Sequence, residues 1–195
     1  MSKRPSSCEL STMNPGWIHK VIEPQNYDEE YKRILQFYVV NTPCEKLSTS
    51  SLPLSHYGWG SKVWKNDELK KKLFEVAGLC RETTFVVAKT LEEMKSSFEK
   101  ASLKKHFHSD RDTERVAVYK SNYNEFLAIC YHIRNSLAHG RFQMYTNSSN
   151  EVVFAMEDGI KQRDKFEVRS RMILKKSTLI KWIDILERND MEESA

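Results

Sequence analysis

The sequence predicts a mainly α-helical fold, a helical bundle with a small β-hairpin as an appendage before the C-terminal helix. Two observations lead to this expectation. Apolar residues recur at helical spacing through most of the chain. After Gly140 the apolar repeat shortens to two residues, as in a strand with one buried face. At 195 residues the chain has the size of a single domain and can bury a core.

The expected domain spans residues 27–190. Residues 1–26 are rich in Ser, Pro and polar side chains and should form a lead-in, and residues 191–195 should form a frayed C-terminus. The net charge of +4 is compatible with nucleic acid without indicating it. The four cysteines contain no Cys-x-x-Cys pair, which disfavours zinc and redox sites. With no apolar leader or membrane-length apolar run, we expect a cytoplasmic protein without membrane contact.

The N-terminal half should hold helical segments separated by a loop. Residues 27–40 have apolar side chains at helical spacing, and Pro43 ends the segment. Residues 41–61 contain several Pro and Gly residues and should be a loop. Its aromatic side chains are expected to anchor the loop to the core rather than to stack on RNA bases. Residues 67–103 keep a helical repeat throughout, as one long helix or as two if Gly78 interrupts it.

Residues 104–120 mix both charges densely and are expected to form a flexible charged loop. Lys104, Lys105 and His106 in this loop are candidate RNA contacts. A metal site is the alternative, because four side chains of ligand type occur here, namely His106, His108, Asp110 and Asp112. We favour the loop, since no helix or strand pattern fixes the geometry of these four residues.

The C-terminal half should contain a helix, a hairpin and a second helix. We expect the first helix over residues 121–139, with Ser121 or Asn122 as its N-cap. Residues 142–156 alternate between apolar and polar on both sides of a polar turn, which predicts the β-hairpin and leaves room for a third short strand near residues 166–172. The last helix should begin near residue 177.

The end of the first of these helices carries the candidate site. One stripe of the helix is apolar and should face the core, formed by Phe126, Cys130, Ile133 and Leu137. His132, Asn135 and His139 fall on the opposite side, and Arg134 lies on a flank. Gly140 is suited to close the helix, so His139 should lie in its last turn.

These residue types suit the cleavage of RNA. The 2′-hydroxyl of RNA is a built-in nucleophile, so cleavage needs a proton acceptor, a proton donor and a cation at the phosphate, but no metal. His139 can act as acid or base, Arg134 can bind the phosphate, and Asn135 can orient the imidazole or bind substrate. The alternative is an ordinary helix end with a solvated Arg, an Asn and a His that interacts with the helix dipole.

Arg134, Asn135 and His139 resemble the motif of the HEPN superfamily (higher eukaryote and prokaryote nucleotide-binding domains), whose RNase members carry Arg, often Asn, and a His four to six residues after the Arg. The resemblance covers about residues 67–188 and is specific mainly at the motif. It implies an all-helical core, RNA cleavage without metal or cofactor, and a homodimer whose motif helices meet at the two-fold axis. The small Ser136 and Ala138 would permit that close approach.

One position departs from the family pattern. Many HEPN toxins that pair with a nucleotidyltransferase antitoxin have Tyr two residues after the His, where this chain has Arg141, so regulation by adenylylation there is in doubt. We expect His132 and Arg141 to contact the RNA.

The expected function is a metal-independent endoribonuclease that acts as a toxin or phage-defence effector. Its expected partners are RNA, a second copy of the chain and an antitoxin or other regulatory protein. One alternative is a catalytically silent domain that binds RNA, nucleotide or a partner protein. Another is a metal-dependent phosphohydrolase built on the loop around His106.

Overall fold

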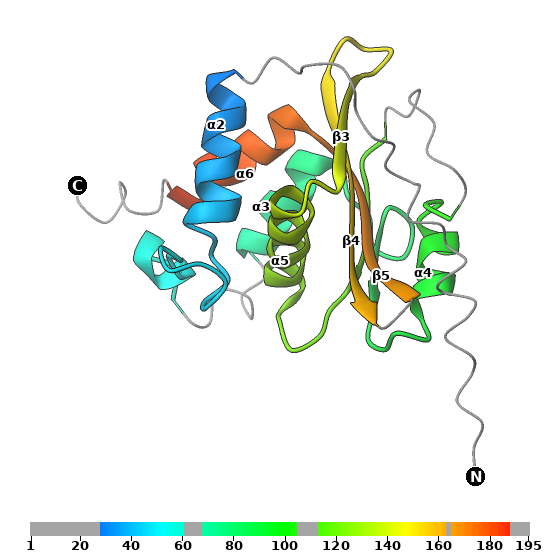
Figure 1. Ribbon diagram of the computed structural model, residues 1–195. Helices are drawn as coiled ribbons and strands as arrows, with labels where there is room; N and C mark the ends of the chain where they lie inside the picture. The colour runs from blue at the N-terminus through cyan, green and yellow to red at the C-terminus, as the bar shows by residue number, and fades with distance from the viewer. Residues whose placement is uncertain (1–27, 61–67, 105–112, 163–164, 188–195) are drawn as a thin grey trace.

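A computed structural model describes residues 28–60, 68–104, 113–162 and 165–187. These residues form five α-helices and a five-stranded mixed sheet, so the chain has an α/β fold and the expected mainly α-helical bundle is wrong (Figure 1). The expected lead-in and the expected frayed C-terminus lie outside the described residues.

The sheet has the strand order β1-β2-β5-β4-β3. Its strands are β1 (Phe85–Ala88), β2 (Arg115–Tyr119), β3 (Phe142–Thr146), β4 (Val152–Gln162) and β5 (Lys165–Lys175). β1 and β2 are parallel, whereas the β2/β5, β5/β4 and β4/β3 pairs are antiparallel. The sheet therefore joins a parallel pair at one edge to a three-stranded meander at the other.

The first two strands lie where other structure was expected. β1 lies in the segment predicted to be helical, residues 67–103, and β2 lies in the segment predicted to be a charged loop, residues 104–120. β1 has the sequence FVVA and β2 the sequence RVAVY, and both are largely buried. A strand buried on both faces has a continuous apolar run, which periodicity cannot distinguish from part of a buried helix. The long 67–103 segment is instead divided into α3 (Glu68–Ala77), β1 and α4 (Met94–Lys100). Gly78 follows α3 with a φ of +59°, as the sequence suggested for an interruption.

The β-hairpin expected after Gly140 is present as β3 and β4, but it is not an appendage. β4 and β5 each have 11 residues and form the centre of the sheet with β2. The pairing of β4 with β5 shifts register between Asp158 and Gly159. Such a bulge redirects side chains locally.

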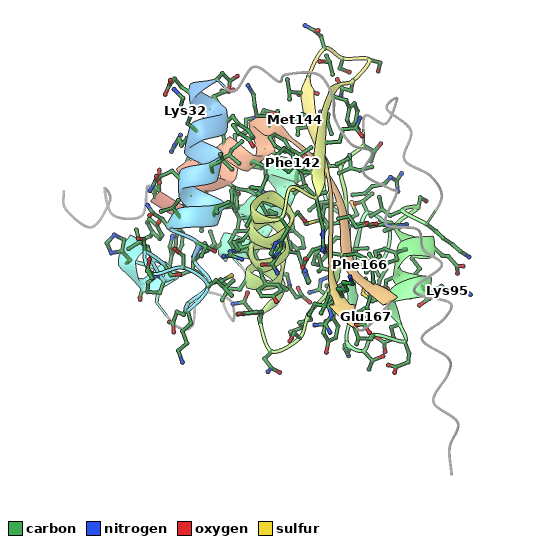
Figure 2. The ribbon with its side chains drawn as sticks, viewed as in Figure 1. Lys32, Lys95, Phe142, Met144, Phe166 and Glu167 are labelled. Atoms are coloured by element: carbon green, nitrogen blue, oxygen red, sulfur yellow. The ribbon has the colours of Figure 1, made fainter. Side chains whose placement is uncertain are left out.

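Helices cover both faces of the sheet. α2 (Glu29–Leu35), α3, α5 (Glu125–Ala138) and α6 (Lys176–Glu187) lie on one side, and α4 lies on the other (Figure 1). Lys32 of α2 and Lys95 of α4 mark the two sides (Figure 2). The larger core packs on the first side and includes Val116, Phe154, Met156, Met172 and Trp182. Within the described residues, no helix has the length and apolar character needed to span a membrane.

Several expected elements are confirmed. The helix at 27–40 is present as α2 and a π-helical continuation, η2 (Gln36–Val40). The last helix begins at Lys176. In the loop that follows η2, a short 3-10 helix, η3 (Leu54–Tyr57), is followed by Trp59, whose Nε1 donates to the Leu186 carbonyl at 2.8 Å. This hydrogen bond confirms that the loop is anchored to the core.

Candidate functional site

α5 is built as a helix that is buried on two sides. The side chain of Asn124 caps it by accepting from the Leu127 amide at 2.8 Å, so the expected cap at Ser121 or Asn122 is wrong. The apolar stripe of Phe126, Cys130, Ile133 and Leu137 is buried as expected. A second buried row, Ala128, His132 and Ser136, also lies inside the protein. The side opposite the apolar stripe is therefore not the exposed polar face that periodicity predicted.

The C-terminal end of α5 has the hydrogen bonds of a Schellman motif. The Arg141 amide donates to the Ser136 carbonyl at 2.8 Å, and the Gly140 amide donates to the Leu137 carbonyl at 3.2 Å. Gly140 has a φ of +63°, which a side chain would disfavour. This motif places His139 at the C-cap, where its side chain is exposed.

Arg134 and Asn135 lie one turn earlier and are partly exposed. The Arg134 guanidinium donates from Nη1 to Asn135 Oδ1 at 3.1 Å and from Nη2 to the Leu47 carbonyl at 3.0 Å. Its Nε is buried and has no hydrogen-bond partner in the described part of the chain. The motif Arg and Asn are thus held together, and Leu47 joins them to the loop between η2 and η3.

His132 is buried, with a side chain 1% exposed. Its Nδ1 lies 2.7 Å from Asp158 Oδ2, and its Nε2 lies 2.9 Å from the Tyr119 carbonyl oxygen. The same Asp158 oxygen accepts from Asn135 Nδ2 at 3.2 Å. This location does not fit the expected contact of His132 with substrate, because both ring nitrogens face the interior.

Arg141 is also held within the protein. Its Nη1 donates to the Gly159 carbonyl at 2.7 Å, and its guanidinium carbon lies 4.1 Å from the ring centroid of Phe166. Phe166 lies near the start of β5 (Figure 2). These contacts join the end of α5 to the β4/β5 pair, so part of the Arg141 guanidinium is already engaged within the protein.

The other expected RNA contacts are not brought to this site. Lys104 is exposed and pairs with Glu99, and its carbonyl accepts from Arg171 on the α4 side of the sheet. The sheet therefore separates Lys104 from α5. Lys105 and His106 lie outside the described residues, as do all four residues of the alternative metal site. Within the described part of the chain, no cluster of three His, Cys, Asp or Glu side chains is arranged to hold a metal.

A cysteine lies close to the motif but is unsuited to be a nucleophile. Burial raises the pKa of the Cys44 thiol to about 12, although Thr42 and Arg134 act in the opposite direction. Its Sγ lies 3.3 Å from the Leu127 carbonyl of α5. A thiol with this pKa stays protonated near neutral pH, so Cys44 is a poor nucleophile.

The sequence did not point to Asp158 or to the Leu47 carbonyl. Glu157 and Asp158 follow five apolar residues of the same strand, and this pair of adjacent acidic residues was the one signal in the sequence. A backbone acceptor such as Leu47 has no sequence signal.

Comparison of the chain with models of protein families, with curated proteins and with solved structures gives no match. The residues and geometry of the α5 end are therefore the basis for a functional proposal.

Proposed function

We propose that the protein is an endoribonuclease that cleaves RNA at the C-terminal end of α5 without a metal. The observation that carries this proposal is the end of the helix itself. A capped helix terminus exposes the imidazole of His139, and the preceding turn holds the Arg134 guanidinium against Asn135. An acid–base group and a permanent cation are thus present on one short segment.

The proposed chemistry is an attack of the 2′-oxygen on the adjacent phosphorus, with loss of the 5′-oxygen. His139 accepts the 2′-hydroxyl proton, and the resulting imidazolium returns a proton to the leaving 5′-oxygen. Arg134 binds the non-bridging phosphate oxygens, where negative charge develops. The products are a 2′,3′-cyclic phosphate and a free 5′-hydroxyl.

A second copy of the chain is part of this proposal. Arg134 and His139 are five residues apart, so on a helix of about 100° per residue their side chains diverge by roughly 140°. A two-fold axis beside α5 would let Arg134 of one protomer converge with His139 of the other. The exposed Ala138 fits this approach, whereas Ser136 is fully buried and cannot lie in the interface.

The alternative is a domain that binds RNA, nucleotide or a partner protein without catalysis. It is favoured by the engagement of Arg134, since two of its donors already bond within the chain. RNA cleavage in excess chelator distinguishes the two functions.

The test uses the parent protein, His139→Ala and a matched control, His56→Ala, because His56 is also exposed. We expect the parent and His56→Ala to cleave RNA in excess chelator, and we expect His139→Ala to lose the activity by orders of magnitude. Folding of both variants is checked by thermal unfolding. RNA binding without cleavage by the parent would favour the silent domain.

The dimer has its own test, in which Arg134→Ala and His139→Ala chains are co-expressed and the mixed dimer is isolated. One chain then supplies Arg134 and the other His139. We expect cleavage by the mixed dimer and none by either homodimer. A parent that is monomeric in sedimentation at the assay concentration, and fully active there, would contradict the shared site.

We further propose that the RNA cleavage serves growth arrest, as a toxin or phage-defence effector restrained by an antitoxin or another regulatory protein. This proposal depends on the resemblance of the motif to that of HEPN ribonucleases. Overexpression should arrest growth when Arg134 and His139 are intact and should be tolerated when either is Ala.

A further inference from the structure

Asp158 and His132 form a buried polar pair between β4 and α5. Their side chains are 3% and 1% exposed, respectively. Burial of polar and charged groups has a free-energy cost that only well-made hydrogen bonds offset. Met156, two residues earlier on the same face of β4, is apolar and fully buried. An apolar side chain can therefore be buried on this face of β4. Core packing alone does not explain why a polar pair occupies this position.

The hydrogen bonds fix the protons of the pair. The Tyr119 carbonyl can only accept, so His132 Nε2 carries a hydrogen. The 2.7 Å contact between His132 Nδ1 and Asp158 Oδ2 then requires one more proton, shared between the two groups. Rotation of either side chain would leave a buried polar group without a partner. The position of Asp158 Oδ2 is therefore strongly determined.

Asp158 in turn sets the direction of the Asn135 amide. Asn135 Nδ2 donates to Asp158 Oδ2 at 3.2 Å, so its Oδ1 faces the other way and accepts from Arg134 Nη1 at 3.1 Å. A flipped amide would place oxygen against the carboxylate and N–H against the guanidinium, and both contacts would be repulsive. A continuous chain of hydrogen bonds thus runs from the core to the partly exposed Arg134.

The backbone next to Asp158 is also constrained, by a register shift and by close packing of two strands. The register of β4 against β5 shifts immediately after Asp158, at Gly159. A Cβ at Gly159 would lie 2.3 Å from the Glu167 carbonyl oxygen, so the close approach of the two strands requires glycine. The bulge and the close packing define where the Asp158 carboxylate points.

We propose that Asp158, fixed by His132, is a positioning residue that holds the Arg134 guanidinium through the Asn135 amide in the orientation that binds phosphate. This inference rests on the proposed RNA cleavage at Arg134 and His139. Asp158 does not touch the substrate. Its contribution is to pre-orient the cation before RNA binds, which lowers the cost of reaching the cleavage geometry.

The test compares two adjacent buried carboxylates, Asp158→Asn and Glu157→Gln. Glu157 pairs with Arg171 on the α4 side, so its variant is a matched control for the loss of a buried charge. We expect kcat/KM for RNA cleavage to fall about 10- to 100-fold in Asp158→Asn. We expect Glu157→Gln to cleave as the parent does at a temperature where both variants are folded.

A double variant separates positioning from a general loss of stability. In an Arg134→Lys background, Asp158 no longer has a guanidinium to orient, so adding Asp158→Asn should cause little further loss of cleavage. Loss by the same factor in the parent and Arg134→Lys backgrounds would overturn the inference. Parent-like cleavage by folded Asp158→Asn would overturn it as well.

Nitrogen NMR of the Arg134 guanidinium measures the positioning without RNA. Hydrogen bonds at both Nη atoms should slow its rotation in the parent and in Glu157→Gln, and Asp158→Asn should release it. Asn135→Ser breaks the same series of hydrogen bonds at a partly exposed position. This variant replaces Asp158→Asn in the experiment if Asp158→Asn does not fold. Unchanged rotation in the folded variants would overturn the inference. Released rotation in a protein that cleaves no RNA would support the positioning and reject the proposed function.

Discussion

Glu157 and Asp158 are neighbours on β4 that point to opposite faces of the sheet, and the two environments differ in one instructive way. Both side chains are buried and both pair with a base, since Arg171 Nε donates to Glu157 Oε2 at 2.9 Å and His132 Nδ1 lies 2.7 Å from Asp158 Oδ2. The Glu157 pair is closed, because Arg171 Nη1 also donates to the Leu103 carbonyl, and the guanidinium lies over Phe98.

The Asp158 pair is open at one end. From Asp158 the hydrogen bonds continue through Asn135 to Arg134, which is partly exposed near the end of α5. Burial and pairing are common to the two carboxylates, so they do not distinguish a structural pair from a functional one. What differs is that the hydrogen bonds of the Asp158 pair continue to a partly exposed cation, Arg134, and the proposed function depends on that connection.

The largest effect on stability should come from breaking the closed pair. Arg171→Met leaves Glu157 buried without its cation, which should lower the free energy of unfolding by about 3–5 kcal/mol. Burial raises the pKa of Glu157 and Arg171 opposes that shift, so the loss should be smaller at acidic pH, where the unpaired carboxyl is protonated.

Urea unfolding of Arg171→Met at two pH values measures this effect. Arg169→Met is the control, because Arg169 pairs with Glu167 at a partly exposed site and should contribute about 0–1 kcal/mol. Equal destabilisation by the two variants would contradict a special contribution of the closed pair.

A third buried carboxylate, Glu114, extends the comparison to a group held by neutral donors. Its oxygens accept from the Lys175 amide at 2.7 Å and the Thr178 hydroxyl at 2.9 Å. Burial raises its pKa to about 7 from 4.5. The folded state therefore binds the proton more tightly, and stability should fall as the pH rises from about 4.5 to about 7, by on the order of 3 kcal/mol.

Glu114→Gln removes this titration and keeps groups that can bond to the same partners. Between about pH 4.5 and about pH 7 the parent should lose stability and the variant should not, so the difference in their free energies of unfolding should change with pH in favour of the variant. Above about pH 7 this difference should stay constant. The exposed Glu92→Gln serves as the control for the pH profile. A difference between Glu114→Gln and the parent that is identical at pH 5 and pH 8 would be inconsistent with the raised pKa.

A smaller effect is expected from the bulge beside Asp158. Gly159→Ala places a methyl group 2.3 Å from the Glu167 carbonyl oxygen, so the strands must separate, at a cost of about 1–3 kcal/mol. Gly60→Ala is the control, because a Cβ there meets no atom within 4 Å. Thermal unfolding compares the two, and a Gly159→Ala protein as stable as Gly60→Ala would reject the close packing of the bulge.

The sequence predicted the parts of the molecule that repeat regularly. The apolar stripe of α5 follows the helical repeat, and the β3/β4 hairpin follows the two-residue repeat of a strand. Both are present, as is the end of α5 at Gly140. β1 was not predictable in this way, because a short apolar run buried on both faces fits a helix equally well.

The candidate site was predictable where it depends on α5 alone. Arg134, Asn135 and His139 lie at the end of the helix as expected, with His139 exposed. The periodicity placed His132 on the polar side, but the sheet covers that side and buries it. Its partner Asp158 is 26 residues away in sequence, so only the tertiary fold brings the two together.

The most direct test of the proposed cleavage uses two RNA oligonucleotides that differ in one sugar. One is all-ribose, and the other carries a single 2′-deoxyribose at the mapped cleavage position, with both assayed in excess chelator. We predict that the parent cleaves the all-ribose RNA to a 2′,3′-cyclic phosphate and leaves the deoxy-substituted RNA intact at that position, and that His139→Ala cleaves neither. Cleavage of the deoxy-substituted RNA at that position, or parent-like cleavage by His139→Ala, would contradict the proposed site and its chemistry.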